Sequence, residues 1–173
     1  MDVFEAMEKR HSVRSYQEGR EVPEELVEEV LRCACLAPSA GNVQPWRFLV
    51  VRDRRLKERL AQAALGQHFL VQAPVVIAVC ADLQAHAASY GKRGVELYAL
   101  QDTAAAIQNM LLAATALGLG TCWVGAFREE EVRQVLGVSR DWRPVALVAL
   151  GYAAREGTQP RKMSHSRLTV HLG

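Results

Sequence analysis

Apolar residues follow helical spacing in some segments of the chain and strand-like spacing in others. From Pro23 to Pro38, apolar residues recur at three- and four-residue intervals, which predicts an amphipathic helix between the two prolines. Its apolar positions are Leu26, Val27, Val30, Leu31 and Ala34. A continuous apolar run over residues 75–81 instead predicts a strand buried on both faces. Helices and strands therefore alternate along the chain.

The remaining elements fit one sheet with helices layered around it. Asp2 is a candidate N-cap for a short helix that reaches Arg10. Further strands are predicted over residues 47–51, 121–124 and 145–152, and further helices over 54–65, 95–117 and 129–136. No repeat or linker interrupts the chain, so we expect a single domain over residues 1–173. The polar, basic segment after Tyr152 is expected to be unsupported unless another surface receives it.

Composition and charge narrow the class of protein. Hydrophobic residues make up 50% of the chain and charged residues 23%, as in globular proteins. The net charge of +2 gives no strong field that would attract nucleic acid or an anionic membrane. The N-terminus lacks a secretory signal pattern, and the four cysteines lie in apolar or helical segments, so we expect reduced thiols and a cytoplasmic protein. Glycines interrupt the uncharged segment 110–127, which fits a buried helix and strand better than a membrane span.

Familiar catalytic motifs are absent. There is no phosphate-binding G-x-x-x-x-G-K-[ST] loop and no G-x-S-x-G nucleophile elbow, and the only G-x-G, at Gly118, follows a predicted helix rather than a strand. The five histidines show no zinc-binding spacing, and Cys33 and Cys35 would lie on nearly opposite faces of a helix. If the protein is an enzyme, we expect a cofactor to carry the reaction.

Three segments could hold such a cofactor. The first, residues 9–14, is basic and is either a solvated helix end or an anion site in which arginines grip a phosphate. The second, residues 37–46, is either a tight connection between a helix and a strand, or a loop whose carboxamide side chains hydrogen-bond to the edge of a heterocycle or to a sugar hydroxyl. The third segment, residues 123–127, either serves only to pack the end of a strand or presents its backbone N–H groups to a planar ligand.

Taken in order, these segments resemble the nitroreductase family of FMN-dependent NAD(P)H oxidoreductases. The resemblance runs from Met1 to about Lys162 and rests on Lys-Arg-His-Ser-Val-Arg at residues 9–14, on Ala-Pro-Ser-Ala-Gly-Asn-Val-Gln-Pro-Trp at residues 37–46, and on the segments 104–123, 147–152 and 160–162. It implies an α+β fold with a mixed sheet flanked by helices, in an intertwined homodimer with one FMN at each of two interface sites. The long helix would then lie at the interface, and the tail would reach around the partner.

The resemblance also implies which residues bind the cofactor. Arg10 and Arg161, with Lys162 nearby, would hold the phosphate, and Arg14 would approach the pyrimidine side of the flavin, where a cation stabilises the reduced anionic ring. Backbone N–H groups at the end of a strand would face flavin N5. The full implied set is Arg10, His11, Ser12, Arg14, Pro38, Ser39, Ala40, Asn42, Gln44, Gln67, Val124, Gly125, Ala126, Arg161 and Lys162, with residues 38–44 contributed by the partner subunit.

The implied reaction is a ping-pong exchange in which NADH or NADPH reduces FMN and a small acceptor, such as a nitroaromatic or a quinone, reoxidises it. No side chain need act as acid or base, and no metal is implied. The chain departs from the family pattern at His11, where arginine is common, and at Gly125, where many relatives carry glutamate. The short segment 83–96 is expected to be a solvated loop; in the alternative, Tyr90, Lys92 and Arg93 meet substrate.

Other functions fit the same residues. A protein that binds flavin or a nucleotide for sensing or storage would need the same pocket without turnover. A family variant could carry out dehalogenation or an oxidation.

Overall fold

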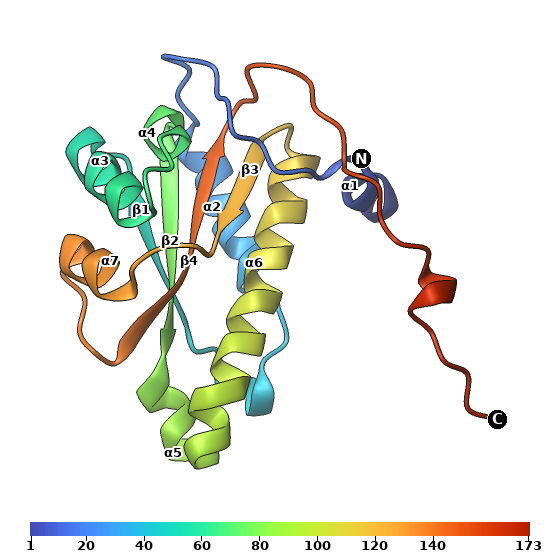
Figure 1. Cartoon of the computed structure of the whole chain (residues 1–173). Helices are drawn as coiled ribbons and strands as arrows, with labels where there is room; N and C mark the ends of the chain where they lie inside the picture. The colour runs from blue at the N-terminus through green and yellow to red at the C-terminus, as the bar shows by residue number, and fades with distance from the viewer.

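The computed structural model describes all residues, 1–173, and contains a single four-stranded sheet (Figure 1). The strands are β1 (Trp46–Val51), β2 (Val75–Asp82), β3 (Gly120–Val124) and β4 (Trp142–Gly151), in the order β1-β2-β4-β3. All three strand pairs are antiparallel, and the only parallel pairing is an isolated bridge between Ser12 and Thr121. The expected α+β class is confirmed, with the parallel part of the sheet reduced to that one bridge.

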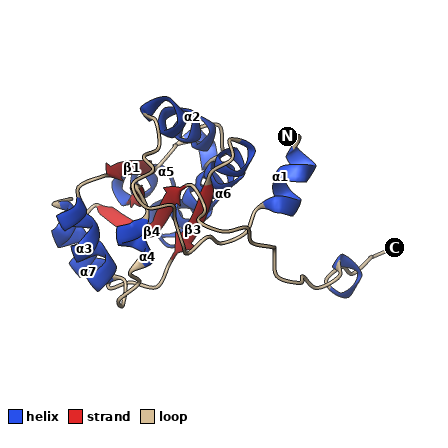
Figure 2. Ribbon diagram, turned by 90° about the horizontal axis from the view of Figure 1, so that it is seen from above, coloured by secondary structure: helices blue, strands red, loops and turns tan.

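Helices cover both faces of this sheet. On one face lie α2 (Glu24–Ala34) and the long α6 (Ala99–Ala116), and on the other lie α3 (Arg54–Ala63), the short α4 (Phe69–Gln72) and α7 (Glu129–Leu136). Figure 2, seen from above, shows the strands between the two groups of helices. The layered arrangement expected from the alternation of elements is therefore present.

The central strand β2 separates two hydrophobic clusters. Ile77 and Val79 pack with α2 and α6, whereas Val76 and Ala78 pack with α3 and α4, because successive side chains of a strand point to opposite faces. Every residue from Val75 to Ala81 is buried. This explains why the sequence shows a continuous apolar run here instead of an alternating one.

The neighbouring strand β4 begins earlier than its sequence predicts. It starts at Trp142 instead of Val145, and the pairing with β2 shifts between Val79 and Cys80, next to the pair Cys80–Pro144. Proline has no N–H to donate to a ladder, so the register change falls where the strand cannot keep regular hydrogen bonding. The irregularity accommodates a proline inside a central strand.

The segment 83–96, expected to be a solvated loop, is largely helical, so that expectation is wrong. Asp82 caps the N-terminus of α5 (Leu83–Arg93) by accepting a hydrogen bond from the N–H of Ala85 at 3.3 Å. Gly91, with φ 54°, interrupts the helix, and a π-helical turn over Gly94–Tyr98 leads into α6. The helix predicted over 95–117 therefore begins at Ala99.

Both ends of the chain lie on the α6 side of the molecule, away from α3 and α7, and the C-terminal tail extends outward from it (Figures 1 and 2). Helix α1 (Val3–Lys9) has the predicted Asp2 cap, completed by Glu5 in a capping box, and packs beside α6. The tail after β4 ends in a short 3-10 turn (His165–Arg167). No helix combines the length and the apolar character needed to cross a membrane.

Candidate functional site

The basic segment after α1 runs along the start of β3. Ser12 bridges to Thr121, and the N–H of Val13 donates to the Thr121 carbonyl at 2.8 Å. Val13 is buried, whereas the side chains of Ser12 and Arg14 are exposed on either side of it. The extended backbone therefore directs a hydroxyl and a guanidinium outward from the same stretch of chain, as the alternating pattern predicted.

Two side chains of the basic segment, Arg14 and Ser12, affect the pKa of the Cys122 thiol in β3. Burial raises the pKa of the Cys122 thiol, and the Arg14 cation and a hydrogen bond from Ser12 oppose that rise. The buried thiol is not an activated nucleophile, because burial is the largest of these influences.

The C-terminal tail returns to the basic segment. The N–H of Ala154 donates to the Ser15 carbonyl at 2.9 Å, and Gln159 Nε2 donates to the carbonyls of Met7 at 2.9 Å and Arg10 at 2.8 Å. Part of the tail is thus anchored on its own chain, which corrects the expectation that it is unsupported there. Arg161 follows two residues later and is exposed, so the chain segments that carry Arg10 and Arg161 meet.

Between these segments the surface is hollowed. A pocket of about 190 Å³ is lined by residues 11–15 and 155–157, and a larger one of about 570 Å³ extends from His11 to the C-terminal end of α6. His11 is half-buried, and its Nδ1 lies 2.9 Å from the Lys9 carbonyl oxygen. Its ring lies so close to Gly157 that a Cβ there would collide with it. The glycine therefore lets the tail pass directly over the histidine.

The turn after β3 presents unused backbone donors. Gly125 and Ala126 are exposed, and their N–H groups donate no hydrogen bond within the chain, whereas Val124 is buried in the sheet. Gln67 Nε2 donates to the Ala64 carbonyl at 2.9 Å and to the Ala126 carbonyl at 3.2 Å. The turn is therefore tied to the end of α3 while its donors face outward.

The loop over residues 38–44 has an unusual backbone. Gly41, Asn42 and Gln44 have φ values of 55°, 56° and 53°, the left-handed region that residues other than glycine seldom adopt. Ser39 Oγ accepts a hydrogen bond from the Gln44 N–H at 3.0 Å. Asn42 and Gln44 are exposed, so their carboxamides are accessible to hydrogen-bond to a ligand, as expected from the sequence.

One chain does not bring this loop to the basic segment. The N–H of Ala40 is bonded to Asp102 in the first turn of α6, whereas His11 lies in a pocket with Thr115 in the last turn. These helical positions are about 20 Å apart, at about 1.5 Å per residue. The loop 38–44 and the basic segment therefore lie at opposite ends of α6. Gln67 and the turn 124–126 are joined to each other by the hydrogen bond to the Ala126 carbonyl.

The chain matches a known protein family over most of its length. Residues 7–69 and 63–152 match the Nitroreductase family. The chain belongs to the nitroreductase family. This membership confirms the resemblance and the enzyme class expected from it, an FMN-dependent NAD(P)H oxidoreductase.

Individual nitroreductase relatives match nearly the whole chain. A protein of Methanothermobacter thermautotrophicus, described as an NADH dehydrogenase or NAD(P)H nitroreductase, is 39% identical over 158 residues, 89% of this chain and 78% of that protein. An NADH dehydrogenase of Thermus thermophilus is 36% identical over 197 residues, 98% of this chain and 96% of that protein. A crystal structure from Parabacteroides distasonis, with the same description as the first, has a TM-score of 0.87 at 28% identity and covers 99% of this chain and 98% of that one.

Two further residues hold the loop 38–44 in place, and they were not predicted from the sequence. Asp102 and His86 are buried, at 7% and 0% exposure, and together they hold the loop through the Ala40 N–H. The available signal for Asp102 was that it is the only charged residue between Glu96 and the end of the predicted helix, because buried carboxylates need partners. Nothing in the sequence pointed to His86, because no helix or strand was predicted for residues 83–94.

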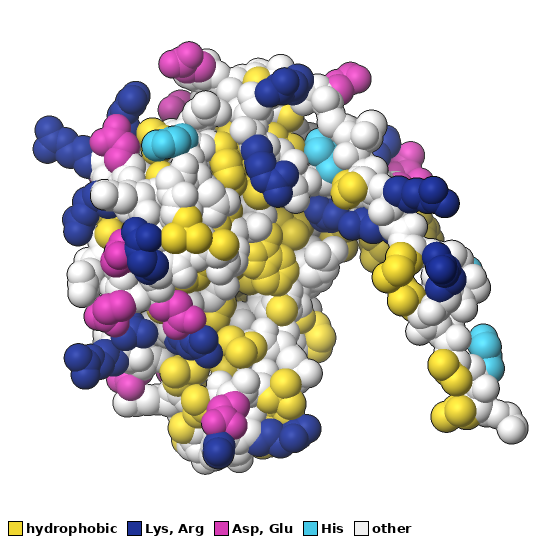
Figure 3. All heavy atoms as spheres, in the orientation of Figure 1, with side chains coloured by type: hydrophobic (Ala, Val, Ile, Leu, Met, Phe, Trp, Pro, Cys, Tyr) yellow, Lys and Arg dark blue, Asp and Glu magenta, His cyan; other side chains and the backbone are white.

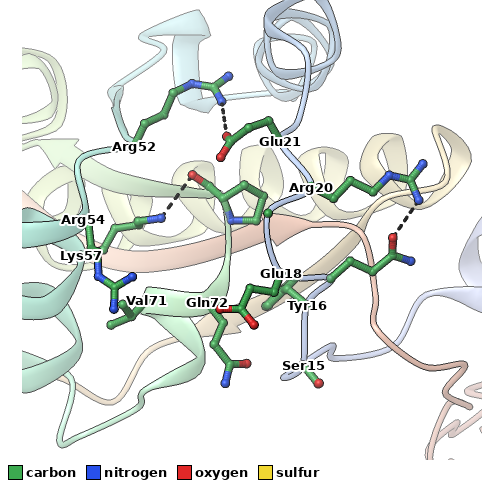
Figure 4. Close-up of a pocket in the computed structure, with 13 residues that line it drawn as sticks. Ser15, Tyr16, Glu18, Arg20, Glu21, Arg52, Arg54, Lys57, Val71 and Gln72 are labelled. Carbon is green, nitrogen blue, oxygen red and sulfur yellow. Dashed lines mark hydrogen bonds and ion pairs between the residues drawn. The ribbon is translucent and has the colours of Figure 1, made fainter.

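A third pocket, of about 460 Å³, shares only Ser15 with the pocket at residues 11–15 and is drawn in Figure 4. It is polar, between residues 15–21 and the helices α3 and α4. Lys57 is buried at its edge and donates from Nζ to the Ala73 carbonyl at 2.7 Å, at the C-terminal cap of α4. Burial lowers the pKa of the Lys57 amine. Capping of a helix end explains this lysine, and we assign the pocket no part in the reaction.

Proposed function

We propose that this chain works as a homodimer in which FMN, bound between two copies, passes electrons from NADH or NADPH to a small acceptor such as a nitroaromatic or a quinone. The observation that carries the proposal is the division of the candidate residues between the two ends of α6. A second copy could bring its loop 38–44 to the basic segment of the first. Each site would then need both chains.

Exposed apolar residues support an extensive contact between copies. Phe4 of α1 is 72% exposed, and the tail carries Leu168, Val170 and Leu172, all at least 65% exposed. Figure 3 shows hydrophobic side chains along this tail. Such a concentration of exposed apolar residues on one segment is typical of a surface that a partner covers.

The basic segment and the tail fit the phosphate end of the cofactor. Arg10, Arg161 and Lys162 supply cations that can bind a phosphate, with arginine able to do so through two parallel hydrogen bonds. His11 and Ser12 would line the phosphate and the ribityl chain. Arg14 would lie at the pyrimidine side of the flavin, where its fixed charge stabilises the anionic reduced ring.

The remaining residues fit the ring. The free N–H groups of Gly125 and Ala126 would donate to the flavin edge around N5, next to Val124 and supported by Gln67. The partner's loop would add a short set of small and carboxamide residues to the ring and ribityl contacts: Pro38, Ser39, Ala40, Asn42 and Gln44.

The chemistry itself belongs to the cofactor. When bound, FMN would supply the hydride-transfer chemistry that the side chains lack: two electrons and one proton would come from NAD(P)H and pass, with one solvent proton, to the acceptor, giving a hydroquinone from a quinone or a nitroso compound and water from a nitroaromatic. The residues of this chain bind, orient and electrostatically bias the ring. We place no side chain as an acid or base.

Anaerobic half-reactions test the proposal. Protein saturated with FMN is mixed first with NADH or NADPH and then, after removal of nucleotide, with a nitroarene or a quinone, while the flavin absorbance is followed. We expect bleaching in the first step and recovery in the second. A protein that binds FMN but is not bleached would be a sensor or storage protein, and one that binds no FMN would overturn the proposal altogether.

A further inference from the structure

A buried histidine and aspartate meet beside the loop 38–44. His86 of α5 is fully buried, and its Nε2 lies 2.7 Å from Oδ2 of Asp102 in α6. A carboxylate can only accept, so the proton of this hydrogen bond is on Nε2. The other ring nitrogen, Nδ1, is buried without a hydrogen-bond partner. This arrangement fits a neutral imidazole whose one N–H is directed at Asp102.

The same carboxylate holds the loop by its backbone. The Ala40 N–H donates to both oxygens of Asp102, at N···O distances of 3.2 and 3.1 Å. It is the only hydrogen bond that joins residues 39–43 to another part of the chain. A bond to a charged acceptor is stronger than one to a neutral acceptor, and burial strengthens it further.

The loop needs such an anchor because of its backbone conformation. Asn42 and Gln44 both have left-handed φ values, which cost free energy in residues with a Cβ. Strained conformations of this kind persist only where the surroundings hold them. The bond from Ala40 lies at the start of the 3-10 turn Ala40–Asn42, so it fixes the turn that carries Asn42 and leads directly to Gln44.

Helix α5 adds a wall on the other side of the turn. The hydroxyl of Tyr90 lies so close to Gly41 that any Cβ there would collide with it. The Tyr90 ring in turn lies 5.3 Å from the Tyr98 ring and 5.9 Å from the His86 ring, measured between centroids. The segment expected to be a loop thus supplies both the histidine and the aromatic wall.

We propose that Asp102 and His86 are positioning residues for FMN binding, acting through the Ala40 N–H on the carboxamides that the loop presents to the flavin of the partner subunit. Asp102 fixes the loop, and His86 orients the carboxylate and supplies the buried donor that it needs. This inference rests on the proposed function, because the loop matters to FMN only if it reaches the cofactor in a dimer.

Paired variants test this role. Asp102→Ala and His86→Leu remove the contacts, whereas Asp102→Asn keeps the size of the side chain and His86→Gln keeps an N–H donor. Thr103→Val is the matched control: Thr103 is a buried polar residue of the same helix whose hydroxyl bonds only to Ala99 and Leu100. For each dimer, the FMN dissociation constant is measured by quenching of flavin fluorescence and the folded fraction by urea titration.

We expect at least a tenfold weaker FMN affinity in Asp102→Ala and His86→Leu, partial recovery in the two conservative variants, and wild-type affinity in Thr103→Val. Wild-type FMN affinity in folded Asp102→Asn and Asp102→Ala would overturn the positioning role, as would an equal loss in Thr103→Val, because the effect would then be one of helix stability. Failure of the wild type to bind FMN would instead reject the proposed function.

Hydrogen exchange gives a second measurement that needs no variant. In the FMN-free wild-type protein, the Ala40 amide is expected to exchange slowly and the amide of Gly125, which has no partner, to exchange rapidly. If Ala40 exchanged as fast as Gly125, the anchor would not exist in solution. This outcome would overturn the inference even if the alanine and leucine variants failed to fold.

Discussion

At the scale of single residues, the proposed site uses fixed charges and backbone donors to bind FMN, and no side chain is proposed as an acid or a base. Arg10 and Arg14 supply cations on one segment, and Gly125 and Ala126 supply free N–H groups on another. Cys122, the only cysteine near them, is buried, and burial raises the pKa of its thiol. A site of this kind binds and biases a cofactor, which agrees with the absence of catalytic motifs in the sequence.

Arg10 offers the simplest residue-scale prediction. Arg10→Ala should weaken FMN binding at least tenfold, because a hydrogen bond to a charged group contributes about 1.5–3 kcal/mol. FMN retention on gel filtration and fluorescence titration measure the effect. Arg20→Ala is the control, since Arg20 stacks on the Tyr152 ring at 3.5 Å and lines the separate polar pocket. Equal losses in the two variants would show that net charge, and not a phosphate contact, sets the affinity.

Gln67 is expected to stabilise the turn after β3. Gln67→Ala removes both hydrogen bonds that this side chain donates, to Ala64 and to Ala126, and should lower the free energy of unfolding by about 0.5–1.5 kcal/mol. Urea titration measures the change. Gln62→Ala is the control, because the side chain of Gln62 is exposed and makes no hydrogen bond. A Gln67 variant as stable as the control would mean that these two hydrogen bonds do not stabilise the turn.

At the scale of elements, each helix positions one part of the site. The start of α6 holds the loop 38–44, its end lines the pocket beside His11, and α3 holds the turn after β3. Helix α5 was not predicted, although Asp82 is an N-cap residue and alanines follow it. Gly91 lies inside this helix and Gly94 directly follows it. Packing decides their role, because Gly94 lies against the backbone of His86, where a Cβ would not fit.

The pair Glu129–Arg143 joins helix α7 to strand β4 and gives a prediction about acid stability. Arg143 donates to both carboxylate oxygens of Glu129, at 3.0 and 2.8 Å, and this contact lowers the pKa of Glu129. The folded-state pKa is below the unfolded value, so the contribution to stability is full above the ordinary glutamate range, about 4.3, and is lost as the pH falls through the lowered value.

The test is Arg143→Gln, compared with the wild type by urea titration at neutral and at acid pH. At neutral pH we expect the variant to be less stable by at most about 1 kcal/mol, because the pair is partly exposed. At acid pH, the difference in the free energy of unfolding between the variant and the wild type should shrink toward zero. A difference that stays constant with pH would assign the effect to packing of the arginine stem instead.

At the scale of the whole molecule, the arrangement of the candidate residues supports the proposed dimer. The loop and the basic segment lie at opposite ends of a helix of 18 residues. The apolar side chains of α1 and of the tail have no cover within the chain. Both features fit the proposed dimer, in which the ends of each chain would contact the other chain.

Mixing two defective variants tests this shared site. Arg10→Ala damages the basic half, and the double variant Asn42→Gly with Gln44→Gly removes the carboxamides while glycine still adopts the left-handed backbone. Each homodimer should bind FMN weakly. A mixed dimer has one doubly damaged site and one intact site, so statistical exchange of subunits should restore tight binding at about a quarter of all sites.

The reference for this experiment is a mixture of wild type with itself, treated identically, which fixes the full occupancy. Flavin bound per chain after gel filtration gives the fraction of tight sites. If mixing restored no tight binding although mixed dimers were present, both halves of the site would come from the same chain, and the dimeric site would be wrong.

The sequence by itself determined the elements whose pattern is local and the residues whose chemistry is distinctive. The strand 75–81 and the helix 129–136 follow from apolar spacing, and the arginines, carboxamides and small residues identified the family, because spacing and chemical type are written directly in the chain. The tertiary structure alone decided which of these residues meet. It separated the loop 38–44 from Arg10 by the length of α6, and it brought His86 to Asp102 from two elements, because such contacts depend on packing between segments distant in sequence.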